Sequence, residues 1–331
     1  MSEHWESVAC PLCGTAAATL AYESGHIAEA GRTAKIVCCD ACGLHRLDPR
    51  PTPAAIGRFY PEEYSCYQSR EAGRKPRLKD RIEAAVLARK FGHPGGDGSF
   101  GESVAAAVGP ALMRRAITRS EWITYRGAGR LLDVGCGAGD FMLRMRRRGW
   151  ASEGFDIGEE HAARIATATG LPCHTGSLTR IEPAAYDLVT FFQVLEHLHD
   201  PVATLREART LLTGVGSVVA TVPNFASWGR KTFGDGWVGL DPPRHLFHYT
   251  PQTLAAVFEA AGFRVTRVAS VGMDGWLRRS SRQSDRGGWR KAFNWKPLAA
   301  LTASVTQAAG VADNILIEAV PDIVSSQAIA A

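Results

Sequence analysis

Short apolar runs alternate with segments of helical periodicity from Gly129 onward, and this alternation limits the folds open to the chain. The apolar runs are RLLDVG, SEGFDI, LPCHTG, YDLVTFFQ, GSVVATVPN, FRVTRVASV and DNILIEAV. Helices are expected to begin near Asp140, Glu159, Pro201 and Pro251. Strands that are connected through helices pair in parallel and are covered by helices on both faces. The sequence therefore predicts an α/β fold with a parallel sheet at its centre.

A glycine-rich turn, LLDVGCGAGDF, follows the first of these strands. Gly135, Gly137 and Gly139 lie where the strand turns into a helix, so the backbone can approach a ligand closely and direct N–H groups at it. Asp133 precedes the first glycine by two residues, and the spacing G-x-G-x-G differs from the dinucleotide fingerprint. Asp156 closes the next strand, where a carboxylate can bind both hydroxyls of a ribose. Together these residues favour an adenosine ligand without a pyrophosphate.

These motifs, with YDLVTFFQVLEHLHDP and the later RHLFHYTPQTL, resemble the class I S-adenosylmethionine-dependent methyltransferases. The likeness is to the branch of ubiquinone and bacterial glycan biosynthesis, and it covers about residues 129–320. It implies a Rossmann-like, doubly wound, mostly parallel sheet of seven strands and S-adenosylmethionine as the cofactor.

The resemblance also implies which residues bind the cofactor. Asp133 and the three glycines would line its methionine end, and Asp156 would bind its ribose. Ser177 and Leu178, after the third strand, would flank the adenine. Residues after the fourth strand would form the floor under the sulfonium; they are Gln193, Val194 and Leu195.

Five of the eight cysteines fall in the first 42 residues, in a pattern typical of a metal site. Cys10-Pro-Leu-Cys13-Gly and Cys39-Asp-Ala-Cys42-Gly are two knuckles, each of which brings two thiolates to one ion. Four thiolates are the set that Zn²⁺ prefers, and a closed set of four indicates a structural role. Cys38 is an alternative to Cys39, and unliganded thiols or a redox pair are the alternatives to zinc.

The chain is expected to have three parts, the last of which carries two insertions. The three parts are a zinc-ribbon-like module at 1–48, a connector at 49–128 and the methyltransferase domain at 129–331. The connector is expected to contain helices near 78–90 and 102–125. The insertions in the methyltransferase domain are a lid at 225–245 and a basic, amphipathic segment at 272–312.

Two histidines are the candidates for the chemistry. Methyl transfer from a sulfonium needs a nucleophile in line with the methyl group, and a base where that nucleophile is a hydroxyl. His197 follows the fourth strand, at the sheet edge where open α/β folds bind ligands, and His245 follows the predicted lid. The alternative is that both only brace a helix or hold the lid by hydrogen bonds. His199, just before a proline-led helix, is expected to be structural.

Three tyrosines in FYPEEYSCY resemble a tyrosine-rich connector of the glycan-type relatives. Tyr60, Tyr64 and Tyr67 would close over the acceptor in that case. Aromatic residues at this spacing are also typical of a core, which is the alternative interpretation.

The net charge of +5 is concentrated in two basic windows. Residues 70–90 carry +5 and residues 278–296 carry +6, so the rest of the chain is at 5 − 11 = −6. With the apolar stretch that continues to 311, the second window suits a helix at an anionic membrane interface or a phosphate-bearing acceptor. The alternative is a solvated face, and no RNA-binding module is recognisable.

The start of the chain has neither a basic nor an apolar leader region, and no apolar run approaches the roughly 18 residues of a membrane span. We expect a cytoplasmic protein that can touch the inner face of the membrane peripherally.

The sequence thus predicts a methyltransferase for a small or carrier-linked acceptor, most plausibly a sugar or glycan precursor on a lipid or nucleotide carrier, with transfer to oxygen favoured over carbon. An RNA methyltransferase that grips its substrate through the zinc module is one alternative. A non-catalytic scaffold that binds the cofactor is the other.

Overall fold

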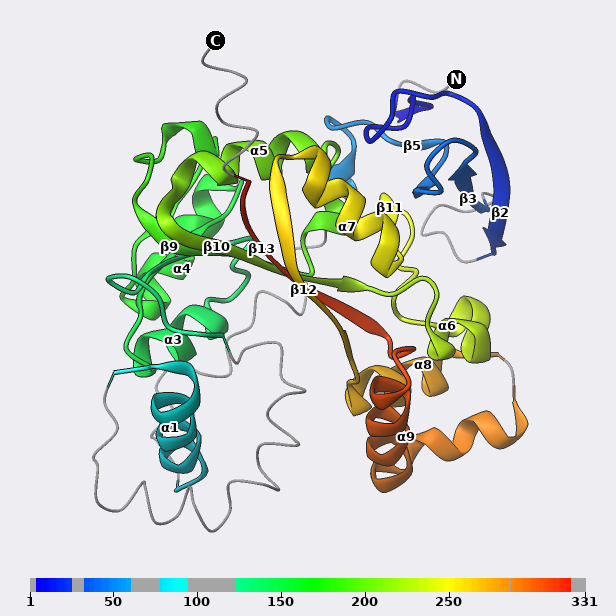
Figure 1. Ribbon diagram of the computed structural model, residues 1–331. Coiled ribbons are helices and arrows are strands. Elements are labelled where there is room, and N and C mark those ends of the chain that lie inside the picture. The colour runs from blue at the N-terminus through cyan, green and yellow to red at the C-terminus, as the bar shows by residue number, and fades with distance from the viewer. Residues whose placement is uncertain (1–3, 26–32, 61–77, 95–122, 286, 323–331) are drawn as a thin grey trace. The chain divides into compact units, whose positions relative to one another are not determined.

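A computed structural model describes residues 4–25, 33–60, 78–94, 123–285 and 287–322 of the chain (Figure 1). The chain divides into two compact units, which are described separately below. Unit 1 comprises Met1–Glu62, Gln193–Arg206 and Ala220–Ala331, and unit 2 comprises Glu63–Phe192 and Glu207–Val219.

Seven strands form the central sheet, in the order β12-β13-β10-β9-β6-β7-β8. Their bounds are β6 Arg130–Val134, β7 Ala151–Phe155, β8 Cys173–His174, β9 Tyr186–Phe192, β10 Leu212–Pro223, β12 Phe263–Val271 and β13 Asn314–Pro321. Strand β6 pairs in parallel with β7 and β9, β7 pairs in parallel with β8, and β12 pairs antiparallel with β13. Each predicted apolar run overlaps one of these strands, so the prediction of a doubly wound, mostly parallel sheet is confirmed.

Four helices begin where the sequence predicts them. They are α3 Asp140–Arg147, α4 Glu159–Thr169, α5 Pro201–Leu211 and α7 Pro251–Ala260. Helix α7 begins with a capping box, in which Thr250 and Thr253 each accept from the other's backbone N–H, and Pro251 occupies its first turn.

Unit 2 is built around the parallel strands β6 and β9, whose apolar side chains are excluded from solvent. Leu131, Leu132, Leu188, Val189 and Phe191 are all fully buried, as expected of strands covered on both faces. Helix α1 (Leu78–Phe91) confirms the helix predicted near 78–90, and the short 3₁₀ helix η3 spans Leu178–Arg180. The helix predicted near 102–125 falls almost entirely outside the described residues, as do Tyr64, Tyr67 and residues 70–77 of the first basic window.

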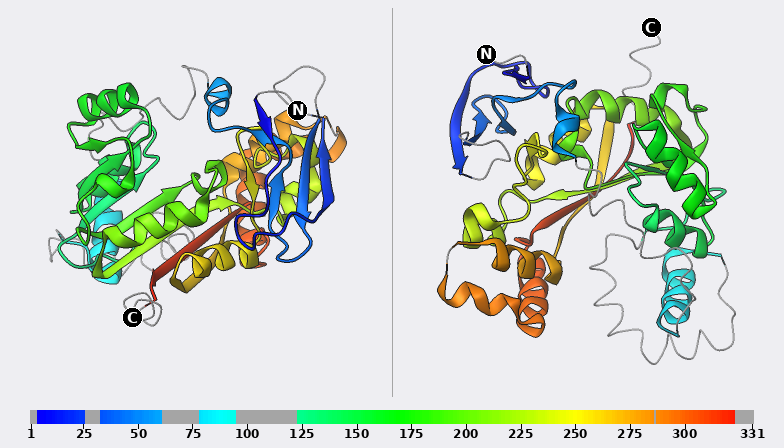
Figure 2. Two further views of the ribbon diagram at one scale, coloured as in Figure 1. Left: turned by 90° about the horizontal axis from the view of Figure 1, so that it is seen from above. Right: turned by 180° about the vertical axis from the view of Figure 1, so that it is seen from behind.

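Unit 1 contains a second, smaller sheet, in the order β11-β4-β3-β2, with antiparallel pairing (Figure 2). The strands are β2 Ala18–Ser24, β3 Ala34–Cys39, β4 His45–Leu47 and β11 Phe247–His248. Strands β1 (Trp5–Glu6) and β5 (Arg50–Pro51) form a separate antiparallel pair. Strand β11 therefore completes a sheet whose other strands come from the N-terminal cysteine-rich segment. This pairing could not be predicted, because a strand of two residues shows no periodicity in the sequence.

The remaining helices of unit 1 are η1 Ile56–Phe59, η4 Leu195–His197, α6 Trp228–Phe233, η5 Gly234–Gly236, α8 Asp274–Gln283, η6 Gly288–Asn294 and α9 Lys296–Ala308. Helices α6, α8, η6 and α9 contribute side chains to one buried, partly aromatic cluster. From the segment predicted as a lid, Phe225, Phe233 and Trp237 are buried in one cluster with Leu277 and Phe293. Helices α8 and α9 and the connecting η6 lie side by side in this part of the unit (Figure 1). In the described parts of the chain, no helix has the length and apolarity needed to cross a membrane.

Candidate active site

The glycine turn of unit 2 has a backbone that side-chain-bearing residues rarely adopt. Gly135, Gly137 and Gly139 have φ values of +69°, +54° and +75°. At Gly139, which precedes α3, a Cβ atom would lie 2.5 Å from the Cγ2 atom of Thr169. The Gly135 N–H donates to the Phe155 carbonyl at 2.8 Å, which ties the turn to the end of β7. The turn is therefore tied to the end of β7, and its backbone suits glycine at all three positions.

Two carboxylates flank this turn within unit 2. Asp133 is buried at the end of β6 and accepts a hydrogen bond from the Thr190 hydroxyl at 2.7 Å. Asp156 follows β7; its carboxylate accepts from the Gly158 N–H at 3.3 Å and lies 3.7 Å from Nε2 of His161. Burial raises the pKa of Asp156, and the nearby His161 opposes that rise.

The predicted adenine-flanking residues lie after β8 in the same unit. The Ser177 hydroxyl accepts from the Thr179 N–H at 3.3 Å and so caps η3. Leu178 is buried within the unit. The structure thus brings the turn, both carboxylates and this pair to the carboxyl ends of neighbouring parallel strands, where open α/β sheets bind ligands.

Gln193, Val194 and Leu195 lie in unit 1, at the point where the chain leaves β9. Gln193 has a φ of +58°, and hydrogen bonds hold it there: its N–H donates to the Thr221 carbonyl at 2.8 Å, and its Nε2 donates to Asn314 Oδ1 at 3.1 Å. The Leu195 carbonyl accepts from the buried Tyr249 hydroxyl at 3.1 Å. A non-glycine residue held in the left-handed region of backbone conformation is strained, and such strain is common at functional sites.

The next residues in unit 1 form a group that we call the Glu–His cluster: Glu196, His197 and His245. One ligating atom from each lies within 4.8 Å of those of the other two. The two imidazole rings meet edge to face, with centroids 4.6 Å apart. Glu196 is fully buried, and neither of its carboxylate oxygens has a hydrogen-bond partner among the described residues.

Backbone carbonyls orient both imidazoles of the Glu–His cluster. Nδ1 of His197 lies 3.1 Å from the Arg244 carbonyl, and Nδ1 of His245 lies 3.0 Å from the Gly239 carbonyl. A carbonyl can only accept, so these contacts favour the tautomer in which Nδ1 carries the proton and Nε2 keeps a lone pair. The Tyr60 hydroxyl also contacts Nδ1 of His197, at 2.9 Å, so the tyrosine-rich connector reaches this cluster.

Burial sets the charge of the Glu–His cluster. It lowers the pKa of His197 to about 3, in the same direction as the repulsion from His245, and it lowers the pKa of His245 as well. Burial also raises the pKa of Glu196 to about 8, and the nearby Asp241 adds to that rise. Both imidazoles are therefore neutral near pH 7.

Asp241 and Arg244 form an ion pair beside the cluster. Asp241 also lies 3.8 Å from Nε2 of His245. The attractions of His245 and Arg244 outweigh the effect of burial and lower the pKa of Asp241.

His199 lies outside the cluster. Its Nε2 contacts the Pro51 carbonyl at 3.0 Å, a contact that agrees with the structural role expected for it. Neither Glu196 nor Asp241 is singled out for the chemistry by sequence reasoning. The one signal for Glu196 is an acidic residue within the short segment that follows β9.

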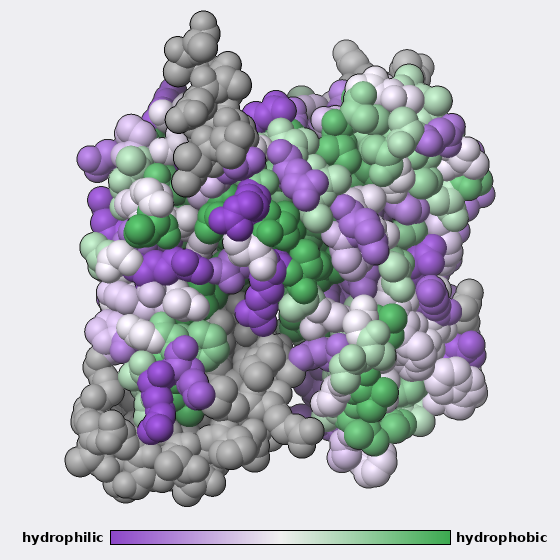
Figure 3. All heavy atoms as spheres, viewed as in Figure 1, coloured by the Kyte–Doolittle hydropathy of each residue, from purple (hydrophilic) through white to green (hydrophobic). Residues whose placement is uncertain are grey.

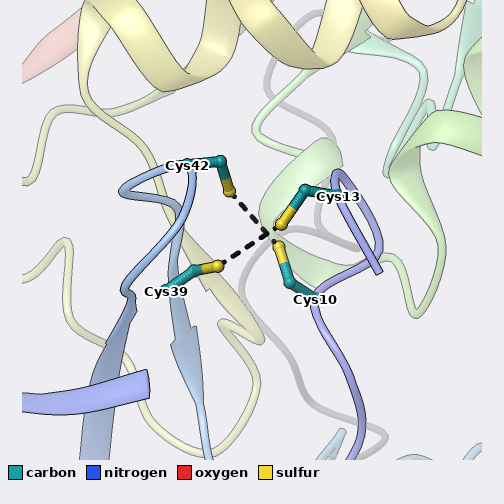
Figure 4. Close-up of side chains that lie close together, drawn as sticks. All are labelled: Cys10, Cys13, Cys39 and Cys42. Atoms are coloured by element: carbon teal, nitrogen blue, oxygen red, sulfur yellow. Dashed lines mark hydrogen bonds between the residues drawn. The ribbon is translucent and has the colours of Figure 1, made fainter. Parts of the chain in front are cut away.

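The four cysteines of the two knuckles, which we call the cysteine cluster, point toward one another in unit 1 (Figure 4). The sulfurs of Cys10 and Cys42 are 3.5 Å apart, as are those of Cys13 and Cys39. Tetrahedral Zn²⁺ with Zn–S bonds near 2.3 Å places its sulfurs about 3.8 Å apart, so the set fits that ion. Cys38 is not part of the group, since its sulfur contacts the Cys39 carbonyl.

Similarity to known proteins shows the family to which the chain belongs. A family model described as a methyltransferase domain matches residues 103–268, half of the chain. The chain belongs to this methyltransferase family. A curated ubiquinone biosynthesis O-methyltransferase from Aeromonas salmonicida is 33% identical to it over 171 residues, which cover 46% of this chain and 72% of that protein. A protein of the same name from Ralstonia nicotianae is 34% identical over 171 residues, 46% of this chain and 71% of that protein.

A solved S-adenosylmethionine-dependent methyltransferase from Mesorhizobium loti superimposes on the methyltransferase with a TM-score of 0.43 at 18% sequence identity, covering 62% of this chain and 99% of that chain. The family makes the protein an S-adenosylmethionine-dependent methyltransferase. The donor set of unit 2 fits that cofactor, because it offers a glycine turn for a close backbone approach and a carboxylate for the two ribose hydroxyls. The residue roles within this set stay predictions.

Proposed function

We propose that the methyltransferase transfers the methyl group of S-adenosylmethionine to a hydroxyl oxygen of a small or carrier-linked acceptor, and that this hydroxyl is held at the Glu–His cluster. The observation that carries the proposal is the place of the cluster. Glu196 and His197 directly follow the residues predicted to underlie the sulfonium, Gln193–Leu195, at the carboxyl end of β9.

S-adenosylmethionine supplies an activated methyl group, so the protein has to align the acceptor oxygen and remove its proton. Asp133, the glycine turn and Asp156 would hold the cofactor. The neutral imidazoles of His197 and His245 offer lone pairs at Nε2, because their Nδ1 atoms are committed to backbone carbonyls. Their orientation is fixed before the acceptor arrives, which lowers the entropic cost of alignment.

A sugar or glycan precursor is the acceptor that we propose first, as the sequence motifs indicate. The names of the curated relatives support oxygen as the methylated atom, and they favour a second candidate, an acceptor of the kind met in ubiquinone biosynthesis. Both candidates are hydroxyl compounds that can be carried at a membrane.

The second basic window supports a carrier-linked acceptor. Helix α9 exposes Leu301 and Val305, whose exposed fractions are 62% and 58%, and Trp295 before it is exposed to 66%. A green patch lies over α9 in the space-filling view (Figure 3), the helix that carries the exposed Leu301 and Val305. Arg278, Arg282 and Lys296 belong to the same segment. An apolar patch with cationic neighbours is typical of a surface that rests in an anionic membrane interface, which we propose as its role.

We propose Zn²⁺ as the ion of the cysteine cluster. Four thiolates saturate a tetrahedral ion and leave no position for a substrate, so the ion would stabilise the small sheet rather than take part in the reaction. Cys39 ends β3, and Cys42 lies in the turn that leads to β4, so the ion would fix the connection between these strands.

The test of the proposed function uses the purified full chain with methyl-labelled S-adenosylmethionine. The acceptors are a nucleotide sugar pool, a polyprenyl-linked sugar, a polyprenylated catechol and total RNA. We expect label in a hydroxyl-bearing small or lipid-linked acceptor, recovered as a methyl ether by mass spectrometry. Label in RNA alone, or on carbon or nitrogen, would overturn the proposal.

A further inference from the structure

We propose that Cys136 and Cys173 form an oxidation site in unit 2, at which a peroxide converts the two thiols into a disulfide, and that this disulfide weakens binding of the cofactor. Both residues lie outside the cysteine cluster. The oxidation site rests on the geometry of the two thiols, whereas its effect on the cofactor rests on the predicted role of the glycine turn. Neither depends on the identity of the acceptor.

The first observation is the contact between the two sulfurs. Sγ of Cys136 lies 3.6 Å from Sγ of Cys173, although 37 residues separate them in the sequence. A disulfide bond is about 2.05 Å long, so the sulfurs, now 3.6 Å apart, have to approach each other by about 1.5 Å. Rotation of a cysteine side chain together with a small shift of the turn would supply this movement.

The second observation is the absence of a side chain at Gly154, which lets the sulfurs meet. Gly154 in β7 is the register partner of Cys173 in β8. A Cβ atom at Gly154 would lie 2.7 Å from Sγ of Cys136, so the Cys136 thiol takes the place of a side chain there. Register partners on neighbouring parallel strands direct their side chains to the same face of the sheet. The two thiols therefore lie on one face, at neighbouring strands.

The third observation is that the surroundings of the two thiols differ. Cys136 is buried in an apolar cluster with Met142, Leu143 and Ile165, whereas Cys173 packs against this cluster and is partly exposed. A peroxide from solvent would therefore reach Cys173 first.

The contact between the thiols also sets their acidity. The hydrogen bond with Cys136 lowers the pKa of Cys173, while burial and the carboxylates of Asp133 and Asp156 oppose this shift without reversing it. The same hydrogen bond, together with burial, raises the pKa of Cys136. A thiolate is the form that reacts with peroxides, and an accessible thiolate beside a second thiol is typical of redox-sensitive cysteines. Cys173 is therefore the reacting thiol and Cys136 the resolving one.

The oxidation takes place in two steps, with hydrogen peroxide as the oxidant. The Cys173 thiolate attacks one peroxide oxygen, a sulfur–oxygen bond forms, the oxygen–oxygen bond breaks, and the departing hydroxide is protonated by solvent. The Cys136 sulfur then attacks the resulting sulfenic acid, the disulfide forms, and the sulfur–oxygen bond breaks as hydroxide leaves with the Cys136 proton as water. The two cysteines lose two electrons in total, and hydrogen peroxide is reduced to water.

The disulfide would act on the cofactor through the glycine turn, because Cys136 is part of that turn. Cys136 lies between Gly135 and Gly137, and its carbonyl accepts from the Gly139 N–H at 2.9 Å. A shift of Cys136 toward β8 would move the glycines on both sides and disturb this hydrogen bond at the start of α3. The turn would then no longer direct its N–H groups at the cofactor as it does in the reduced protein.

The test compares the full-length protein, with its cysteine cluster filled with Zn²⁺, before and after treatment with hydrogen peroxide. Trypsin releases Cys136 in the peptide 131–144 and Cys173 in the peptide 165–180, neither of which contains another cysteine. After free thiols are blocked, we expect mass spectrometry to find these two peptides joined by a disulfide. The Kd for S-adenosylhomocysteine should rise by about tenfold or more, the effect of losing one or two hydrogen bonds, and dithiothreitol should restore it.

Cys173→Ser lacks the reacting thiol, so its Kd should equal that of the wild type and should not change with peroxide. Cys38→Ser is the matched control, since Cys38 lies outside both groups of cysteines, and it should respond like the wild type. Absence of the joined peptides from the treated wild type would overturn the oxidation site. Joined peptides with an unchanged Kd, or an equal loss of affinity in Cys173→Ser, would overturn the effect on the cofactor. Neither measurement uses an acceptor, so both are independent of the proposed function.

Discussion

The cysteine cluster and the Glu–His cluster lie in the same unit and are built on opposite principles. The cysteine cluster has four equivalent soft donors, of which Cys13 is exposed, on two short turns at the edge of a small sheet. The Glu–His cluster has three unlike donors, two of them buried, directly after a central strand. Four thiolates can saturate one tetrahedral ion and leave no position open, whereas a buried imidazole with a lone pair at Nε2 can accept a hydrogen bond or a proton from a bound hydroxyl.

The largest expected effect is at the cysteine cluster. Cys39→Ser should lose the zinc and lower the melting temperature by about 10 °C or more, because a structural zinc contributes directly to the free energy of folding. Zinc content by atomic absorption and a thermal scan measure both effects. Cys38→Ser is the matched control and should keep one zinc and the wild-type melting temperature. Retention of the zinc by Cys39→Ser, together with its loss from Cys38→Ser, would mean that Cys38 and not Cys39 is the ligand.

A smaller effect is expected at the predicted cofactor site in unit 2. A variant there tests cofactor binding without altering the Glu–His cluster. Asp156→Ala should weaken binding of S-adenosylhomocysteine about 10- to 100-fold, the size of the loss of hydrogen bonds to a charged group. Isothermal titration calorimetry gives the affinity directly. Glu160→Gln, an exposed acid in the next helix, should leave it unchanged. Undiminished binding by the Asp156 variant would remove this residue from the site.

A pH-dependent effect concerns a second buried acid of unit 1, Asp313. Unlike Glu196, it has a partner, because it accepts a hydrogen bond from Trp237 Nε1 at 2.8 Å. Burial raises its pKa to about 6 from an ordinary value of 3.8. The folded state then keeps a proton that the unfolded state has lost, so this group makes stability fall as pH rises from about 4 to 6.

Asp313→Asn should remove that dependence while its amide oxygen still accepts from Trp237. We expect the difference in unfolding free energy between variant and wild type to change by at most about 3 kcal/mol over this range. Urea unfolding at pH 4 and pH 7 measures it. A difference that does not vary with pH would show that Asp313 does not titrate as its burial requires.

The cysteine cluster and the Glu–His cluster also differ in how far they can be predicted from the sequence. The knuckles were predictable because each is a local turn whose ligands are three residues apart, and the strands were predictable because buried parallel strands are continuous apolar runs. The Glu–His cluster joins residues from η4 and from the segment before β11, so only the fold brings them together. His197 and His245 could be selected individually from their places at the sheet edge, but Glu196 could not, since burial without a partner is not visible in a sequence.

The central claim is that the acceptor, and not the cofactor, is handled at the Glu–His cluster, and a comparison of turnover with cofactor affinity in His245→Asn tests it most directly. The variant should lose at least about 100-fold in kcat for the hydroxyl acceptor. It should bind S-adenosylhomocysteine as tightly as the wild type, while His199→Asn should retain both properties. A kcat within a few-fold of the wild type, or a loss explained entirely by weaker cofactor binding, would contradict the claim.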